Sequence, residues 1–188
     1  QMTLFERSPK EYADRYLFGK KQRISRNIAL GSALAEALEA GEADGDPLLD
    51  LMASKLPKYE LMDQPVEADL KDGKEIIKLL AKPDSAKSDY STFYEYKTSI
   101  KPWTQKQVDD SGQITFYALV IWLKTGKIPK DIELIGLTTE YDETGRLNAN
   151  GDIWRFKTTR NMVDIIKMIT RIKKAWNGIK KLCKQELL

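Results

Sequence analysis

Two acidic residues and a lysine, spaced as Asp84, Glu95 and Lys97, constrain the fold of this chain more than any other feature. Successive side chains of a β-strand point to opposite faces, so a strand through this segment places Glu95 and Lys97 on one face and Tyr96 on the other. Asp84 follows an apolar run, residues 76–81, which is typical of a neighbouring strand. If the two strands pair, both carboxylates and the amine converge on one point.

These residue types suit a hard divalent cation. Magnesium prefers oxygen ligands and usually binds through one or two carboxylates, several waters and a substrate phosphate. The carboxylates of Asp84 and Glu95 and the backbone carbonyl of Tyr96 are the expected ligands. Lys97 would hold an attacking water or balance negative charge that builds on a phosphate. The alternative is a solvated strand with alternating charges that binds no metal.

A second pair of residues follows this segment. Gln113 and Tyr117 are four apart, so a helix stacks them on one face, although the same spacing also fits ordinary helix decoration. The motifs are Pro83-Asp84, ten residues, Glu95-Tyr96-Lys97, and then Gln113-x-x-x-Tyr117. Together they resemble the PD-(D/E)xK nuclease superfamily, in particular its RecB-like and Cas4-like exonuclease branch.

The resemblance covers nearly the whole chain and implies both a fold and an activity. The implied fold is α+β: a restriction-endonuclease-like core, with a small mixed β-sheet flanked by helices, as one domain over residues 1–188. The implied activity is hydrolysis of DNA phosphodiester bonds with Mg²⁺ or Mn²⁺, as in exonucleases of phage or bacterial recombination and repair. In this interpretation Asp84, Glu95 and Tyr96 bind the metal, while Lys97, Gln113 and Tyr117 complete the catalytic set. DNA is the expected partner, with a second copy or a recombination helicase as further possibilities.

One position departs from the pattern of that branch. The segment from Gly31 to Glu39 resembles the first motif of RecB-like nucleases, which usually carries a metal-binding histidine where this sequence has Ala35. Glu36 points about 100° away on a helix, and Glu39 lies one turn on. For both glutamates, solvent exposure is the simpler expectation. The departure leaves open a nucleic-acid-binding module with an impaired site, or a subunit of a larger DNA-processing complex.

Composition narrows the chemistry further. The chain has 188 residues, no histidine and one cysteine, Cys183, with a net charge of +3. These counts exclude histidine-based nucleophilic catalysis, histidine-ligated zinc, an internal disulfide and a cysteine-ligated iron–sulfur cluster. No apolar run is long enough to span a bilayer, and no secretory leader is visible. We therefore expect a cytoplasmic protein of a bacterium or a phage-infected cell, with no membrane partner.

Periodicity and capping signals predict alternating helices and strands. Helices are expected at 8–19, 26–40, 46–56, 111–124 and 162–188, and strands at 65–70, 76–84, 92–98, 132–141 and 152–159. The segments at 85–91 and 100–110 are expected to be loops. Asp72-Gly73 predicts a hairpin turn between the first two strands. Glu67 on the first of them could face the metal site or be a surface carboxylate of the hairpin.

Two further features could contact DNA. Trp103 follows the strand that carries Glu95, where it could stack on a base or simply cover the core. The last helix has an apolar stripe and a basic opposite face with few acids, so phosphate contact is expected there. The basic residues chosen for this role are Lys173, Lys174, Lys180 and Lys181.

Overall fold

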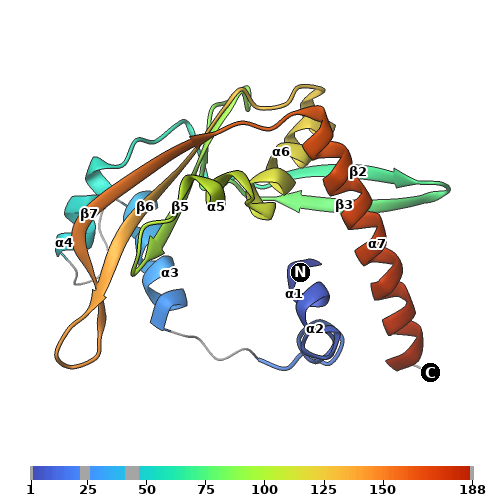
Figure 1. Ribbon diagram of the computed structural model, residues 1–188, viewed down its shortest axis with the longest axis horizontal. Coiled ribbons are helices and arrows are strands. Elements are labelled where there is room, and N and C mark those ends of the chain that lie inside the picture. The colour runs from blue at the N-terminus through green and yellow to red at the C-terminus, as the bar shows by residue number, and fades with distance from the viewer. Residues whose placement is uncertain (1, 22–25, 41–46, 187–188) are drawn as a thin grey trace.

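The computed structural model describes residues 2–21, 26–40 and 47–186 (Figure 1). A five-stranded sheet has the order β1-β4-β5-β6-β7. Its strands are β1 (Leu61–Met62), β4 (Ser85–Ala86), β5 (Thr92–Ser99), β6 (Asp131–Tyr141) and β7 (Leu147–Thr158). β5 and β6 are parallel and the other neighbouring pairs are antiparallel. The expected α+β class, a small mixed sheet flanked by helices, is confirmed.

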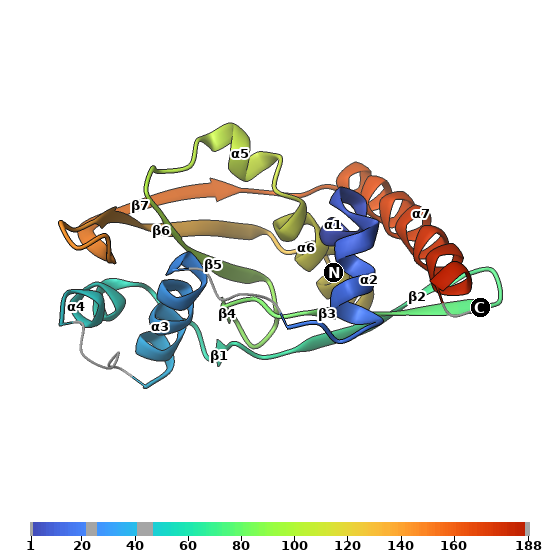
Figure 2. The same ribbon diagram turned by 90° about the horizontal axis from the view of Figure 1, so that it is seen from below.

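Side-chain alternation along β5 divides the molecule into two cores. Phe93 faces the larger core, which contains buried residues of α6 (Gly112–Thr125) and α7 (Met162–Glu186). Tyr96 faces the smaller core, built with α3 (Arg26–Ala40) and α4 (Pro47–Lys55). Helices therefore cover both faces of the sheet (Figure 2). The strand between them can present Glu95 and Lys97 on the α6 side while Tyr96 anchors the α3 side.

The strand expected to carry Asp84 is shorter and lies elsewhere. β2 (Val66–Asp72) and β3 (Glu75–Ala81) pair with each other as a separate two-stranded ribbon, with its turn at Gly73, φ 61°. The prediction that this strand reaches Asp84 and lies beside the strand at 92–98 is wrong. Val66, Leu70 and Ile77 bury the inner face of the ribbon in the larger core, where the ribbon packs against α6.

The neighbour of β5 is instead β4, two residues within the predicted polar loop. Ser85 lies opposite Tyr94, and Ala86 lies opposite Phe93. β4 also pairs with β1, so the segment that directly follows Asp84 has a strand on each side in the main sheet. Asp84 thus lies next to β5 because it directly precedes β4, and not because it ends β3.

Helix boundaries follow local capping chemistry. Ser8 caps α2 (Pro9–Tyr16) by accepting a hydrogen bond from the Glu11 amide at 3.2 Å, and α2 ends before the expected Gly19. Ser111 caps α6, and Gly126 ends it with φ 75°. The predicted end of α3 at Gly41 and the predicted start of α4 at Asp46 lie outside the described residues.

Three features differ from the predicted elements. α1 (Met2–Arg7) was not expected, and α5 (Gln105–Asp109) replaces part of the loop predicted at 100–110. β7 begins at Leu147 instead of Asp152. The β6–β7 register shifts between Leu137 and Thr139, Gly151 has a φ of 96°, and pairing then continues to Leu147 beside the hairpin turn.

None of the described helices is long and apolar enough to cross a membrane.

Gly136 allows the indole of Trp154 to lie across β6, next to the strand that carries Lys97. A Cβ at Gly136 would lie 1.9 Å from the Trp154 ring, and Trp154 is only 9% exposed. We expect Gly136→Ala to lower the free energy of unfolding by about 1–3 kcal/mol or more through overpacking, measured by chemical denaturation. Gly31→Ala is the control, because its Cβ meets no atom within 4 Å and alanine favours the helix. An unchanged denaturation midpoint for Gly136→Ala would contradict this packing.

Candidate active site

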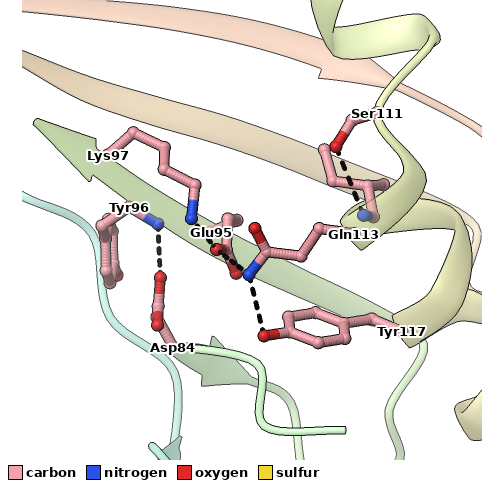
Figure 3. A network of polar contacts seen from close by, with 8 residues as sticks. Asp84, Glu95, Tyr96, Lys97, Ser111, Gln113 and Tyr117 are labelled. Atoms are coloured by element: carbon pink, nitrogen blue, oxygen red, sulfur yellow. Dashed lines mark hydrogen bonds and ion pairs between the residues drawn. The ribbon is translucent and has the colours of Figure 1, made fainter. Parts of the chain in front are cut away.

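Two hydrogen bonds fix the position of Asp84. The Asp63 amide donates to the Asp84 carbonyl at 3.0 Å, extending the β1–β4 pairing by one step. The Tyr96 amide donates to Asp84 Oδ2 at 2.6 Å. The carboxylate of Asp84 is therefore held against the backbone of β5, beside Glu95 (Figure 3).

Glu95 is the buried centre of the cluster. Its side chain is 1% exposed, and its Oε1 accepts hydrogen bonds from Lys97 Nζ and from Gln113 Nε2, the latter at 2.7 Å. Its second carboxylate oxygen, Oε2, is buried and has no hydrogen-bond partner. A buried unpaired carboxylate oxygen is costly, so this atom is chemically suited to receive a cation.

Helix α6 supplies the other side of the cluster. Gln113 lies in its first turn, just after the Ser111 cap, and also donates to the Tyr117 hydroxyl at 2.9 Å. The Tyr117 ring packs edge-on against Phe93, with centroids 6.1 Å apart. The structure therefore brings together all five residues that the sequence proposed as the catalytic set (Figure 3).

Burial shifts the acidity of both carboxyl groups. The pKa of Glu95 is raised to about 8, chiefly by burial and then by the adjacent charge of Asp84, while Lys97 opposes the shift. Burial also raises the pKa of Asp84, against the lowering effect of the Tyr96 amide and of Lys97. Two neighbouring carboxyl groups with raised pKa values repel each other when both are ionised, and a divalent cation relieves that repulsion.

A cavity of about 310 Å³ opens onto this cluster. Asp84, Glu95, Tyr96, Lys97 and Gln113 line it, together with Asp63 and Met62 from the end of β1. Helix α3 forms the facing wall with Gly31, Leu34, Ala35 and Leu38. Residue 35 therefore faces the candidate site. Glu36 is exposed and is not among the lining residues, and the side chain of Glu39 lies outside the described residues.

The donor set fits a cation that keeps part of its water shell. Across residues 2–21, 26–40 and 47–186, no three His, Cys, Asp or Glu side chains form a complete metal site by themselves. Two carboxylates, with water and substrate oxygens in the remaining positions, is the usual arrangement for Mg²⁺. The unpaired Oε2 of Glu95 and the raised pKa values of both carboxyl groups therefore agree with a magnesium-type site.

The residues proposed for DNA contact lie apart from the cavity. Trp103 is half-buried and packs against the larger core. On α7, Lys173 forms an ion pair with Asp72 at 3.0 Å, and Lys180 forms one with Glu75 at 2.5 Å. The basic face of α7 is thus partly neutralised by the β2–β3 ribbon.

The remaining proposed residues are not part of the cavity either. Lys174 and Lys181 are both exposed on α7. Glu67 is exposed on β2 and does not line the cavity. Asp63 does line the cavity, although it was not predicted from the sequence. It directly follows β1, and a strand of two residues is too short to give a recognisable hydrophobic pattern.

Comparison with known proteins supports the fold. No protein-family model matches the chain, and no curated protein matches it. A structure described as "Putative exonuclease" from Eubacterium rectale is similar with a TM-score of 0.55 and 14% identity, covering 90% of this chain and 75% of that chain. The structure of SSO0001 has a TM-score of 0.47 and 12% identity, covering 88% of this chain and 67% of that chain. The Eubacterium rectale structure and this chain share a mixed sheet flanked by helices.

The acidity of Glu95 predicts how stability depends on pH and metal. Because its folded pKa is raised, protonated Glu95 stabilises the metal-free fold fully below its unfolded pKa, and this contribution is lost as pH rises to about 8. We expect the melting temperature of the metal-free protein to fall over that interval and Mn²⁺ to restore it. Glu95→Gln mimics the protonated group and should flatten both responses, as measured by thermal unfolding. If the wild-type melting temperature changed with neither pH nor Mn²⁺, the raised pKa of Glu95 and its role in metal binding would both be contradicted.

Proposed function

We propose that this protein is a metal-dependent DNA nuclease that hydrolyses phosphodiester bonds. The observation that carries the proposal is the buried Asp84–Glu95 pair, with an unpaired carboxylate oxygen and Lys97, at one cavity. Paired carboxylates can hold a divalent cation, and a lysine can stabilise the negative charge that develops on a phosphate during hydrolysis. The resemblance to the RecB-like branch adds support from the same residues. It favours an exonuclease of bacterial or phage recombination, acting as a homo-oligomer or with a helicase.

Each residue has a distinct role in this proposal. Asp84, Glu95 and the carbonyl of Tyr96 hold Mg²⁺ or Mn²⁺. When bound, this cation polarises a phosphate oxygen and lowers the pKa of a water molecule. Lys97 leaves Glu95 to contact the phosphate or the attacking water. Gln113 then remains bonded to Glu95 and Tyr117, so it keeps the carboxylate oriented while the lysine moves.

A second candidate function is supported by Ala35. In this alternative the chain binds nucleic acid with an impaired site, because the cavity wall carries a methyl group where RecB-like nucleases carry a ligand. The two functions differ in metal binding. An impaired module would bind DNA without a requirement for Mg²⁺ or Mn²⁺, whereas the nuclease requires the metal for cleavage.

We expect Asp84→Ala, Glu95→Ala and Lys97→Ala each to lower DNA cleavage by at least about 10²-fold, because each removes a group from the reacting centre. Cleavage of labelled single- and double-stranded DNA, with open or blocked ends, measures the loss and also defines the substrate. Lys78→Ala is the control, since Lys78 is exposed on the β2–β3 ribbon. Full cleavage by any of the three variants would remove that residue from the site.

Residue 35 offers a gain-of-function test. Ala35 lines the cavity, so we expect Ala35→His to add an imidazole ligand and to raise metal affinity. Imidazole suits Mn²⁺ better than Mg²⁺, so Mn²⁺-supported cleavage should rise most. Cleavage and metal titrations of both proteins with each ion measure this change. Glu36→His is the matched control on the exposed side of α3. Equal behaviour of Ala35→His and wild type would mean that residue 35 does not reach the metal.

The lysines of α7 separate into two expected classes. Lys174→Ala and Lys181→Ala should weaken binding to all DNA sequences, and the salt slope should fall by about one unit for each phosphate that the variant no longer neutralises. Lys173→Ala and Lys180→Ala should change the stability of the β2–β3 ribbon more than DNA affinity, because their ammonium groups are paired with Asp72 and Glu75. DNA binding at several salt concentrations tests this division. If the salt dependence of DNA binding were the same for all four variants, the ion pairs with Asp72 and Glu75 would not determine which lysines contact DNA.

A further inference from the structure

Asp63 brings a third carboxylate to the candidate metal cavity. It lines the cavity with Asp84 and Glu95, and its amide hydrogen bond to the Asp84 carbonyl ties its backbone to that of Asp84. Asp63 directly follows β1 and Asp84 directly precedes β4, so both acids lie at the same end of the β1–β4 ladder, in which Met62 lies opposite Ser85. A change in the position of one must therefore move the other.

The backbone of Asp63 is held in an unusual conformation. Its φ is 49°, in the left-handed region that only a few per cent of non-glycine residues adopt, with Asp and Asn enriched. Such conformations persist where the surroundings enforce them, and they cluster at functional sites. At Asp63 the backbone amide is held by its hydrogen bond to the Asp84 carbonyl.

Around the cavity, carboxyl groups outnumber ammonium groups. Three carboxylates, those of Asp63, Asp84 and Glu95, face two ammonium groups, those of Lys82 and Lys97. Lys82 forms an ion pair with Asp63, and Lys97 forms one with Glu95. The buried Oε2 of Glu95 has no partner and independently marks the same cluster as a cation site.

We propose that Asp63 is a third carboxylate of the divalent-cation site, acting on the ion through a metal-bound water. This inference rests on the proposed function, because it concerns the same metal. A water-mediated role follows from the absence, among the described residues, of three acidic groups close enough for direct coordination. Without metal, Lys82 is the ion-pair partner of the Asp63 carboxylate. The side chain of Lys82 is 52% exposed, against 32% for that of Asp63, so its ammonium group can move to solvent or to a DNA phosphate.

Mn²⁺ binding to the DNA-free protein tests this role without measuring cleavage. Groups that orient metal ligands or metal-bound water typically change affinity 10–100-fold, so we expect Asp63→Asn to weaken Mn²⁺ binding by about 10-fold or more in calorimetric titration. Asparagine tolerates positive φ, so this variant keeps the backbone geometry. Lys82→Ala removes the competing ammonium and should leave Mn²⁺ affinity unchanged or raise it. Asp69→Asn, on the exposed side of β2, should have no effect.

The outcomes separate the two proposals. If wild type binds Mn²⁺, Asp84→Asn abolishes binding and Asp63→Asn binds as wild type, then Asp63 is only the partner of Lys82. In that case this inference is overturned and the metal site of the proposed nuclease stands. If Lys82→Ala weakens Mn²⁺ binding as much as Asp63→Asn does, the ion pair itself shapes the site and the water-mediated role is wrong. If wild type binds no Mn²⁺, both proposals fail together.

Discussion

Burial of the Glu95 carboxylate is the constraint on which the rest of the site depends. Glu95 is 1% exposed in the middle of β5, where an isolated carboxylate would be expensive. Its Oε1 is satisfied by Lys97 from the same strand and by Gln113 from α6, while burial keeps the group largely protonated near neutral pH. In the metal-free arrangement, Lys97 and Gln113 therefore both donate hydrogen bonds to Oε1 of Glu95.

This constraint also explains why α6 begins where it does. Ser111 caps the helix two residues before Gln113, so the side-chain amide of Gln113 reaches Glu95 from the first turn. Arg160, just after β7, supports the same turn by donating to the Thr115 hydroxyl at 2.7 Å and, more weakly, to the Ser111 carbonyl at 3.4 Å. β5 and α6 are thus connected through polar contacts as well as through the apolar core.

Residues with local signals could be predicted from the sequence, and residues placed by tertiary pairing could not. The cap at Ser8, the end of α6 at Gly126 and the shared face of Glu95 and Lys97 follow from capping chemistry and strand alternation. α5 was missed although its capping box, Thr104 with Gln107, was present in the sequence.

The strand beside Asp84 had no comparable signal. β1 and β4 have two residues each, too few for a periodic pattern, and they exist because each pairs with a neighbour. The sequence predicts that the apolar run at 76–81 joins the main sheet. Its alternation indicates a strand but does not show with which strand it pairs. Asp63 was missed for the same reason, since its place beside Asp84 arises only once β1 and β4 pair.

The two walls of the cavity differ in chemistry, and this difference bears on what the site can bind. One wall carries the charged groups of Asp84, Glu95 and Lys97, and the other is the apolar side of α3 at Leu34 and Leu38. A free phosphate or a simple metal complex would use only the charged wall. A nucleotide has an anionic phosphate on one side and a sugar and base with apolar surface on the other, so it can use both. The methyl group of Ala35 keeps the second wall apolar, where a histidine would extend the polar wall across the cavity. The same residue therefore weakens the case for a strong metal site and strengthens the case for close contact with a nucleotide.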